Sequence, residues 1–206
     1  MDIQVNHQGE VNKARCMPQS HNIIATKTVS AEIHIFDYFK HPTKPASAHE
    51  FKEPQLRLAG HEREGYGLCW SKAREGLLIS GSDDGIICAW DVNKCGTDSN
   101  VVSPVVSVRD AHSGQVVEDV TWSHFNENEF ASVGDDRHLR LWDLRDPHSC
   151  VGSTSQQSDD LMCIDSSAFD PYVLVTGSND SKVLLWDTRN LEQPVMALNF
   201  HTDQVT

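Results

Sequence analysis

The chain has 206 residues, of which 38% are hydrophobic and 23% are charged, and its formal net charge is −13. This composition is typical of a globular protein with an apolar core and excludes a disordered tail, and no apolar run approaches the roughly 18 residues that span a bilayer. The acidic charge favours basic partners and argues against direct nucleic-acid binding, since no basic stretch is denser than "HPTKP", although the same charge would also serve solubility alone.

Four copies of one pattern run along the chain. In each copy a hydroxyl residue stands ten positions before the aromatic residue that closes a predicted strand. A turn rich in Gly, Ser and Asp lies between them, flanked by alternating apolar residues, which is the signature of a β-hairpin. The pairs are Thr26 and Phe36, Ser80 and Trp90, Ser132 and Trp142, and Thr176 and Trp186. Such a repeat predicts units of four short strands joined by turns.

The first unit, residues 7–55, is the most divergent of the four. It has His7 in "VNHQGE" and closes on Phe36, in "IHIFD", where the other units have tryptophan. Its turn has no aspartate, and Glu32 is the nearest acid. We therefore expect this unit to depend more on apolar packing, with extra length in the loop at 38–55.

The second and third units, residues 56–108 and 109–153, share one arrangement. Each has a histidine upstream, in "AGHE" or "DAHS", and an aspartate six residues before the tryptophan, in "SDDGIICAWD" or "GDDRHLRLWD". The second unit has a further long loop at 93–104. The shared residues are His61, Ser80, Asp84 and Trp90 in the second unit and His112, Ser132, Asp136 and Trp142 in the third.

The fourth unit, residues 154–200, keeps the spacing but not the histidine. Its hairpin "SNDSKVLLWD" contains Asp180, whereas Gln157 or Ser158 stands where the histidine is expected. We expect this unit, like the first, to depend more on apolar packing. The sequence "HTDQVT" at residues 201–206 has the pattern of the start of another repeat.

These units resemble WD40 repeats. In that family the histidine, hydroxyl, aspartate and tryptophan form a buried hydrogen-bond network that stabilises each blade of a β-propeller. The chemistry is reasonable, because a buried indole N–H needs an acceptor and a neutral histidine can bridge a hydroxyl and a carboxylate. The resemblance implies that the indoles of Trp90 and Trp142 bond to Ser80 and Ser132. It also makes Asp136 a structural residue rather than a catalytic one.

The resemblance implies an all-β fold, a WD40 β-propeller. Such rings normally close with seven blades, and 206 residues supply about four. An open partial ring leaves unpaired blade edges, which predicts self-association through them.

No catalytic, metal or cofactor motif is present in the sequence. The eleven histidines show no H-E-x-x-H spacing, and there is no nucleophile elbow, phosphate loop or dinucleotide fingerprint. The six cysteines are scattered without a C-x-x-C pair, which argues against zinc ribbons and disulfides and favours reduced thiols in cytosol or nucleus. The first residues, "MDIQVNHQGE", do not have the pattern of a secretory signal. We therefore predict a binding protein that is not an enzyme and uses no cofactor or metal.

The predicted start of each unit's innermost strand carries the candidate binding residues. In a WD40 propeller these strand starts surround the mouth of the central channel. Counting sixteen residues back from each hydroxyl gives Glu10, Glu64, Val116 and Asp160, and two residues further on lie Asn12, Tyr66, Glu118 and Met162. Such a set predicts a site for an extended basic peptide, held by carboxylates and by a cation–π contact with the tyrosine. Exposed acids without a ligand are the alternative.

A narrower resemblance runs along essentially the whole chain. The sequences "GEVNKAR", "MPQ", "EGYGL", "VVEDVTW" and "WDLR" are similar to the histone-binding WD40 proteins associated with retinoblastoma protein and chromatin assembly factor. Members are nuclear subunits of chromatin assembly, deacetylase, Polycomb and remodelling complexes, and the channel mouth binds the basic tail of histone H3 or similar basic motifs. The resemblance implies a peptide-binding set of Glu10, Asn12, Glu64, Tyr66, Glu118 and Asp135, with Glu64 and Glu118 projecting into solvent.

That family also has a histone H4 site, built from a long N-terminal helix and an acidic loop in a late blade, and we expect this chain to lack it. Two other functions stay open. "WDLR" at 142–145 and "WDTR" at 186–189 match a short box by which some WD40 proteins dock on cullin-type ubiquitin ligases. A glutamate-rich WD40 family acts in ribosome assembly. The nucleus is the expected location, with the cytoplasm left open.

Overall fold

A computed structural model describes residues 4–47, 51–95 and 99–206. The first three residues, and parts of the two predicted long loops at 48–50 and 96–98, lie outside the described residues. Within the described ranges the helical segments are two 3-10 turns, η1 (Tyr38–Lys40) and η2 (Val92–Lys94), and neither is long enough to cross a membrane.

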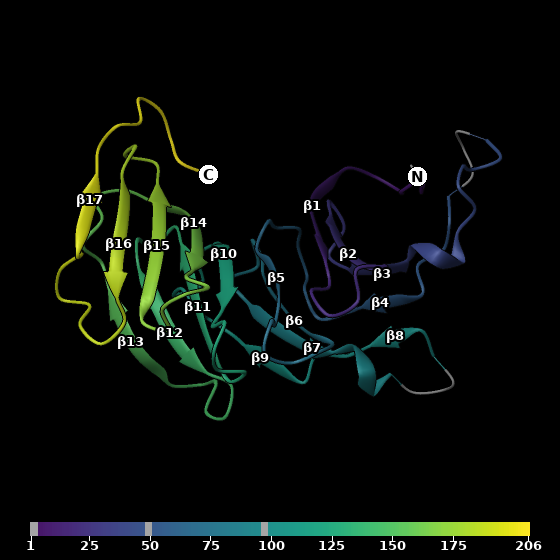
Figure 1. Ribbon diagram of the computed structural model, residues 1–206, viewed down its shortest axis with the longest axis horizontal. Coiled ribbons are helices and arrows are strands. Elements are labelled where there is room, and N and C mark those ends of the chain that lie inside the picture. Colours follow the sequence, from purple (N-terminus) through teal and green to yellow (C-terminus); the bar gives the residue numbers. More distant parts are fainter. Residues whose placement is uncertain (1–3, 48–50, 96–98) are drawn as a thin grey trace.

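The strands form four sheets that stand side by side along an arc (Figure 1). Blade 1 consists of β1 (Val11–Cys16), β2 (Ile23–Thr28), β3 (Ile33–Asp37) and β4 (Leu56–Leu58). Blade 2 consists of β5 (Leu68–Trp70), β6 (Leu77–Gly81), β7 (Ile87–Asp91) and β9 (Val106–Val108). Blade 3 consists of β10 (Val117–Trp122), β11 (Glu129–Gly134), β12 (Leu139–Asp143) and β13 (Cys150–Thr154). Blade 4 consists of β14 (Leu161–Ser166), β15 (Val173–Ser178), β16 (Val183–Asp187) and β17 (Met196–Leu198). The prediction of an all-β partial propeller with about four blades is confirmed.

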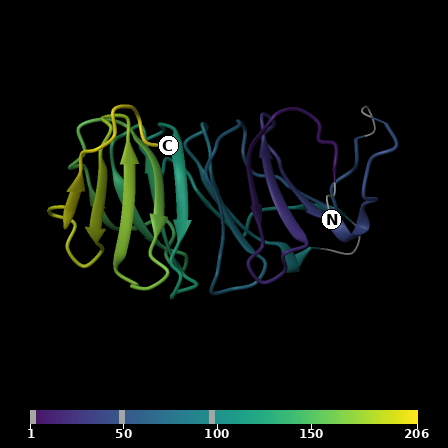
Figure 2. The same cartoon turned by 45° about the horizontal axis from the view of Figure 1, so that its top comes forward.

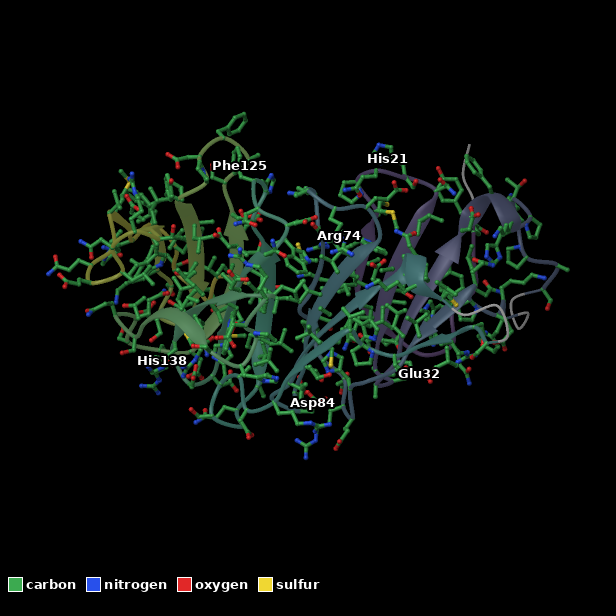
Figure 3. All side chains as sticks on the ribbon, turned by 90° about the horizontal axis from the view of Figure 1, so that it is seen from below. His21, Glu32, Arg74, Asp84, Phe125 and His138 are labelled. Carbon is green, nitrogen blue, oxygen red and sulfur yellow. The ribbon has the colours of Figure 1, made fainter. Side chains whose placement is uncertain are left out.

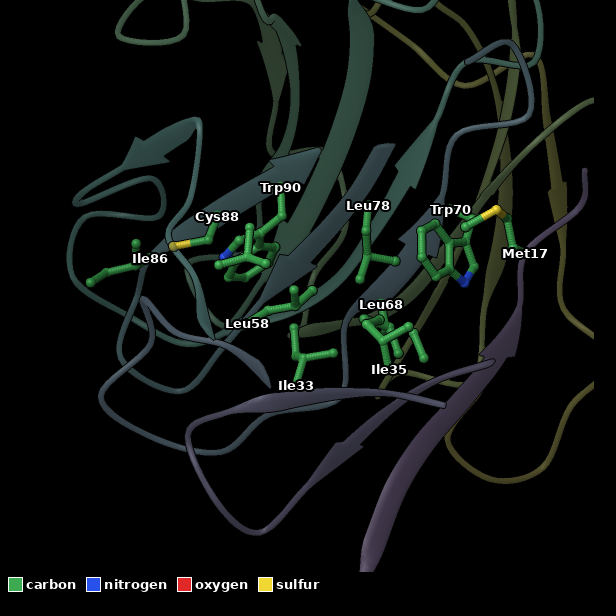
Figure 4. Close-up of a cluster of buried hydrophobic side chains, with 12 residues drawn as sticks. Met17, Ile33, Ile35, Leu58, Leu68, Trp70, Leu78, Ile86, Cys88 and Trp90 are labelled. Carbon is green, nitrogen blue, oxygen red and sulfur yellow. The ribbon is translucent and has the colours of Figure 1, made fainter. Parts of the chain in front are cut away.

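The apolar core lies between the blades rather than within one sheet. Each short strand alternates its side chains between two faces, and a face that meets a neighbouring blade is covered by it. One buried cluster joins blades 1 and 2 and contains Ile33, Leu58 and Trp90, with Trp70 beside Met17 at its other end (Figure 4). Equivalent clusters lie between blades 2 and 3 and between blades 3 and 4. Neighbouring blades are therefore held by continuous apolar packing.

The first strand of each blade, β1, β5, β10 or β14, lies on the inner side of the arc (Figure 2). Polar bonds join these inner strands across the blade boundaries. The indole of Trp70 donates to the carbonyl of Arg15 at 2.9 Å, and the hydroxyl of Ser166 donates to the carbonyl of Trp122 at 2.7 Å. The inner strands therefore keep fixed spacings, and side chains at their starts are brought near one another.

The long loop at 93–104 contains a strand that the sequence pattern does not predict. Residues Val101–Val102 form β8, which pairs in parallel with β4 at the outer edge of blade 1. This pairing satisfies backbone groups of an edge that would otherwise be open. Two valines among polar residues are too short a run to be distinguished from a loop by periodicity.

The last residues lie against the end of β15 in blade 4, where the inner strand of a further blade would begin. The amide of Val205 donates to the carbonyl of Ser178 at 3.1 Å. The same bond joins blades 2 and 3, where the amide of Val117 donates to the carbonyl of Ser82 at 3.1 Å. Residues 201–206 therefore contact blade 4 as the start of an adjacent blade would.

Candidate functional site

One face of the arc carries both the hairpin turns and the starts of the inner strands, and we call it the mouth face. Seen from below, the hairpin-turn residues Glu32, Asp84 and His138 lie toward one edge, whereas His21 and Phe125 lie toward the opposite edge (Figure 3). An equivalent backbone bond occurs in every blade on the mouth face. The bonds are Val29 N–H to Glu10 O (3.3 Å), Asp83 to Glu64 (2.9 Å), Asp135 to Val116 (3.2 Å) and Asn179 to Asp160 (3.0 Å). The four strand starts selected by spacing are thus equivalent in space.

Three of the residues two positions further on occupy β-bulges. The pairing register of the inner strand shifts between Val11 and Lys13, between Val117 and Asp119, and between Leu161 and Cys163. The bulged residues are Asn12, Glu118 and Met162. A bulge inserts an unpaired residue and re-aims its side chain, and bulges are frequent beside binding sites. The side chains of Asn12, Glu118 and Met162 therefore do not follow the regular in-and-out alternation of the inner strands.

In blades 1 and 2 the predicted peptide-binding residues lie close together. The amide of Asn12 donates to the carboxylate of Glu64 at 3.0 Å and to the carbonyl of Gly65 at 3.3 Å. Glu10 is exposed, and Tyr66 is 51% exposed just before β5 begins. Glu64 is half-buried, so the expectation that it projects freely into solvent is wrong. The bond from Asn12 fixes the carboxylate of Glu64. The exposed ring of Tyr66 follows two residues later in the chain.

In blade 3, Glu118 is half-buried against Asp135. The expectation that Glu118 projects into solvent is therefore also wrong. The bulge directs Glu118 toward the hairpin turn, where its carboxyl and that of Asp135 share a hydrogen bond. Burial, the negative charge of Asp135 and this bond raise the pKa of Glu118 to about 7. Burial and neighbouring acids, Asp160 first, also raise the pKa of Asp135. Two carboxyls in this arrangement favour either a shared proton or a cation between them.

Two acids outside the predicted peptide-binding set of six also face this region: Asp83, and Asp160, which the count of strand starts had already selected. Asp83 occupies the same turn position in blade 2 as Asp135 does in blade 3, and burial together with Glu64 raises its pKa. Asp160 starts the inner strand of blade 4, and Arg137 lies near it at 3.4 Å. Asp83 could have been found from sequence, since "SDDG" and "GDDR" align position by position.

The raised pKa of Glu118 predicts a pH-dependent effect on stability. Its carboxyl stays protonated up to about pH 7 in the folded protein, against a usual pKa of 4.5, so folding takes up a proton between these values and stability falls as pH rises through the window. Glu118→Gln removes this titration. We expect the variant to exceed wild type in free energy of unfolding at pH 8, by less than about 2 kcal/mol because solvent screens a half-buried group, and to match it near pH 4, below the usual pKa. Denaturant titrations at both pH values test this, and an equal offset at both would contradict it.

The hydrogen-bond network of blade 3 joins all four predicted residues. His112 bonds through Nδ1 to the carboxylate of Asp136 at 2.6 Å and through Nε2 to the hydroxyl of Ser132 at 2.7 Å. The indole of Trp142 donates to the same hydroxyl at 2.8 Å. A carboxylate only accepts, so the imidazole proton lies on Nδ1 and Nε2 accepts from the serine. Burial lowers the pKa of His112 and so favours this neutral form.

The network aspartates also shape their own hairpin turns. The carboxylates of Asp84, Asp136 and Asp180 each accept from the backbone amide two residues further on. The intervening residue has a left-handed backbone, with φ of 74° at Gly85 and 63° at Arg137. An aspartate that closes such a turn and also bonds a buried histidine explains why the acid recurs at this position.

In blade 2 the predicted bond between Trp90 and Ser80 is wrong. The indole of Trp90 instead donates to the carbonyl of Ala59 at 2.9 Å. His61 still bridges Ser80 and Asp84, at 3.2 Å to each. The position that an indole occupies on the hydroxyl in blade 3 is taken here by Lys27 of blade 1, whose amine lies 2.7 Å from Ser80. A cation bonds a hydroxyl more strongly than a neutral indole does, which accounts for the displacement.

Blade 4 keeps polar bonds at the network positions despite its missing histidine. The indole of Trp186 donates to the hydroxyl of Thr176 at 2.9 Å, and that hydroxyl donates to Gln157 at 2.7 Å. Ser158 bonds the turn carboxylate of Asp180. The two contacts of one histidine are thus divided between two neighbouring residues.

In blade 1, His7 bonds Thr26 at 2.8 Å, but Phe36 offers no N–H and packs edge-on against the imidazole. Its network is therefore reduced to one bond plus aromatic packing.

Comparison with known families gives a match over much of the chain. The sequence model of the family described as WD domain, G-beta repeat, matches residues 52–91, 103–143 and 148–187, together more than half of the chain. Each matched range begins near the outermost strand of one blade and ends with the third strand of the next. The repeat therefore extends across a blade boundary and joins neighbouring sheets covalently.

Proposed function

The chain belongs to the WD40 repeat family, whose propellers serve as protein-interaction scaffolds, and on this premise we propose that it binds the basic N-terminal tail of histone H3 at the mouth face. It would act as a histone-binding subunit of chromatin assembly, deacetylase, Polycomb or remodelling complexes, in the nucleus. The resemblance of "GEVNKAR", "MPQ" and "EGYGL" to the histone-binding branch of the family supports this proposal.

The arrangement of acids carries the proposal. Carboxylates from all four blades stand at equivalent strand starts and turns, at Glu10, Glu64, Asp83, Glu118, Asp135 and Asp160. Burial, together with the neighbouring acids, raises the pKa of Asp83, Glu118 and Asp135, which means that their environment favours an added positive charge. An extended tail with several Lys and Arg side chains supplies such charges at intervals, and Tyr66 offers an exposed ring for a cation–π contact.

Calorimetric titration with a histone H3 N-terminal peptide tests the proposal. We expect binding that weakens from 50 to 500 mM salt, since screening acts on exposed charge pairs. Tyr66→Ala should weaken binding by about 0.5–2 kcal/mol, the usual range for a cation–π contact. Tyr172→Ala is the matched control, because that tyrosine precedes β15 at the opposite end of blade 4 and lies under Arg189 instead. Equal affinities for the two variants would exclude Tyr66 from the site.

The cullin-docking alternative gains no support from the W-D-x-R boxes. Arg145 and Arg189 each fold back onto the aspartate two residues before them, Asp143 or Asp187, with two N–H groups on one carboxylate. Both guanidiniums are thus already engaged within their own turns. No feature of the mouth face favours ribosome assembly over chromatin. Self-association through the blade edges stays a prediction of the sequence.

A further inference from the structure

Lys27 is the most unusual buried group in the described residues. The alternating run "IIATKT" forms β2, where Lys27 pairs with Lys13 on one side and Ile33 on the other. A lysine in such a strand is usually exposed at its amine, because burying an ammonium is costly unless it is paired. Here the side chain has 0% exposure. It leaves blade 1 and enters blade 2, so it adds a buried polar link between two sheets whose shared core is apolar.

The amine bonds two groups of β6 in blade 2. It donates to the hydroxyl of Ser80 at 2.7 Å and to the carbonyl of Gly81. Through Ser80 it joins the network of His61 and Asp84, and it occupies the position that an indole takes on Ser132 in blade 3. This blade network therefore receives one of its members from the neighbouring blade.

The same amine lies under the mouth segment Glu64–Tyr66. A Cβ atom added at Gly65 would come within 3.0 Å of Lys27 Nζ and 2.7 Å of Ser82 Cα, so this segment is seated directly on the lysine and on the strand it holds. Two hydrogen bonds also hold the segment: the hydroxyl of Ser82 donates to the carbonyl of Glu64 at 2.5 Å, and the amide of Asp83 donates to the same carbonyl at 2.9 Å. We infer that Lys27 is the positioning residue that fixes the Glu64–Tyr66 segment for peptide binding.

The charges around Lys27 fit this role. Burial lowers its pKa to about 7, while the carboxylates of Asp84, Asp83 and Asp119 and the thiol of Cys88 act in the opposite direction. Those groups come from blades 2 and 3, and His61 also faces the amine. In the described residues no carboxylate lies within ion-pair distance of the amine. The Lys27 amine is therefore held by its hydrogen bonds to Ser80 and Gly81. The same two bonds fix the end of β6 under the Glu64–Tyr66 segment.

The inference rests on the proposed function for its binding readout, so the experiment has a second readout that needs no peptide. Lys27→Met keeps the length of the side chain and removes both bonds. Hydrogen exchange is followed at the amide of Asp83, which bonds Glu64, and at the amide of Asn179, which makes the equivalent bond to Asp160 in blade 4. We expect exchange at Asp83 to accelerate at least about tenfold with little change at Asn179, because only the Glu64–Tyr66 segment loses the contact with Lys27.

Peptide affinity separates positioning from general stabilisation. The folded fraction of Lys27→Met should bind the histone H3 tail peptide about tenfold more weakly, although no side chain of the proposed peptide-binding set has changed. Lys44→Met, which removes an exposed positive charge, is the charge-matched control and should bind as wild type does. A variant that lowers the unfolding midpoint but leaves the affinity unchanged would overturn the inference.

Ser80→Ala covers the case in which Lys27→Met does not fold. It removes the hydroxyl that the amine bonds, and it leaves the Trp90 indole on Ala59. We expect the same changes in exchange and affinity, smaller in size. Thr176→Val is its matched control in blade 4, where the hydroxyl bonds Trp186 and Gln157 and no lysine. If wild type binds no peptide, the proposed function fails while the exchange comparison still decides the role of Lys27. Equal exchange at Asp83 in wild type and both variants would refute it.

Discussion

Glu118→Lys and Glu64→Lys are each expected to abolish binding of the histone H3 tail peptide while leaving the protein folded. The reversal at Glu118 removes a carboxylate from the pair with Asp135 and puts an ammonium in its place, which then neutralises Asp135. The reversal at Glu64 removes the acceptor of Asn12 and repels an incoming cation. A loss of at least about 2 kcal/mol, or roughly 30-fold in affinity, is expected for each, because a like charge now meets the ligand.

Calorimetry at low and moderate salt measures the loss, and thermal unfolding verifies that the variants are folded. Glu127→Lys is the control, since it changes the net charge equally in an exposed loop next to Phe125, on the edge opposite the mouth face. Loss in all three variants would mean that the peptide senses only the overall charge. Binding retained in both mouth variants would exclude the mouth face as the site.

Much of the fold could be predicted because it depends on spacing. The interval of ten residues between hydroxyl and tryptophan is the length of a strand, a tight turn and a second strand, and in blade 3 it places Ser132 under the Trp142 indole at 2.8 Å. The sixteen-residue interval likewise spans the inner hairpin, so Glu64 and Val116 lie at equivalent strand starts. Local chain geometry sets these spacings.

Contacts between blades could not be predicted in this way. Lys27 is 53 residues from Ser80 in the sequence, and no periodicity within either unit indicates that a lysine of one displaces the tryptophan of the other. The position of the Glu118 side chain could not be predicted either. A regular alternation of side chains between the two faces of the strand would place its carboxyl in solvent, but the extra residue of the bulge turns it toward Asp135. Tertiary packing decided both outcomes, and a pattern that is read one strand at a time does not include it.

The other large effect is expected at Asp136. Its side chain is 7% exposed, and its carboxylate accepts from His112 at 2.6 Å, from Arg140 at 2.7 Å and from the amide of His138 at 3.1 Å. Asp136→Ala leaves the guanidinium and the imidazole without their acceptor and opens the turn. Removal of one member of a buried ionic network costs about 3–5 kcal/mol, so a loss near 3 kcal/mol in the free energy of unfolding is expected at pH 7.

The adjacent carboxylate supplies the control for this prediction. Asp135→Ala removes the same functional group one residue away, but this loss removes the bond to Glu118 while also relieving repulsion among the neighbouring acids, so stability should stay nearly level. The pH dependence differs as well. Burial opposes ionisation of Asp136, but the bonds from His112 and Arg140 outweigh it and hold its pKa far below the usual range. A carboxylate with a depressed pKa contributes stability above about pH 4 that is lost as pH falls through the folded value. The gap between wild type and Asp136→Ala should therefore narrow in acid, and a cost below about 0.5 kcal/mol at pH 7 would make Asp136 an ordinary turn residue.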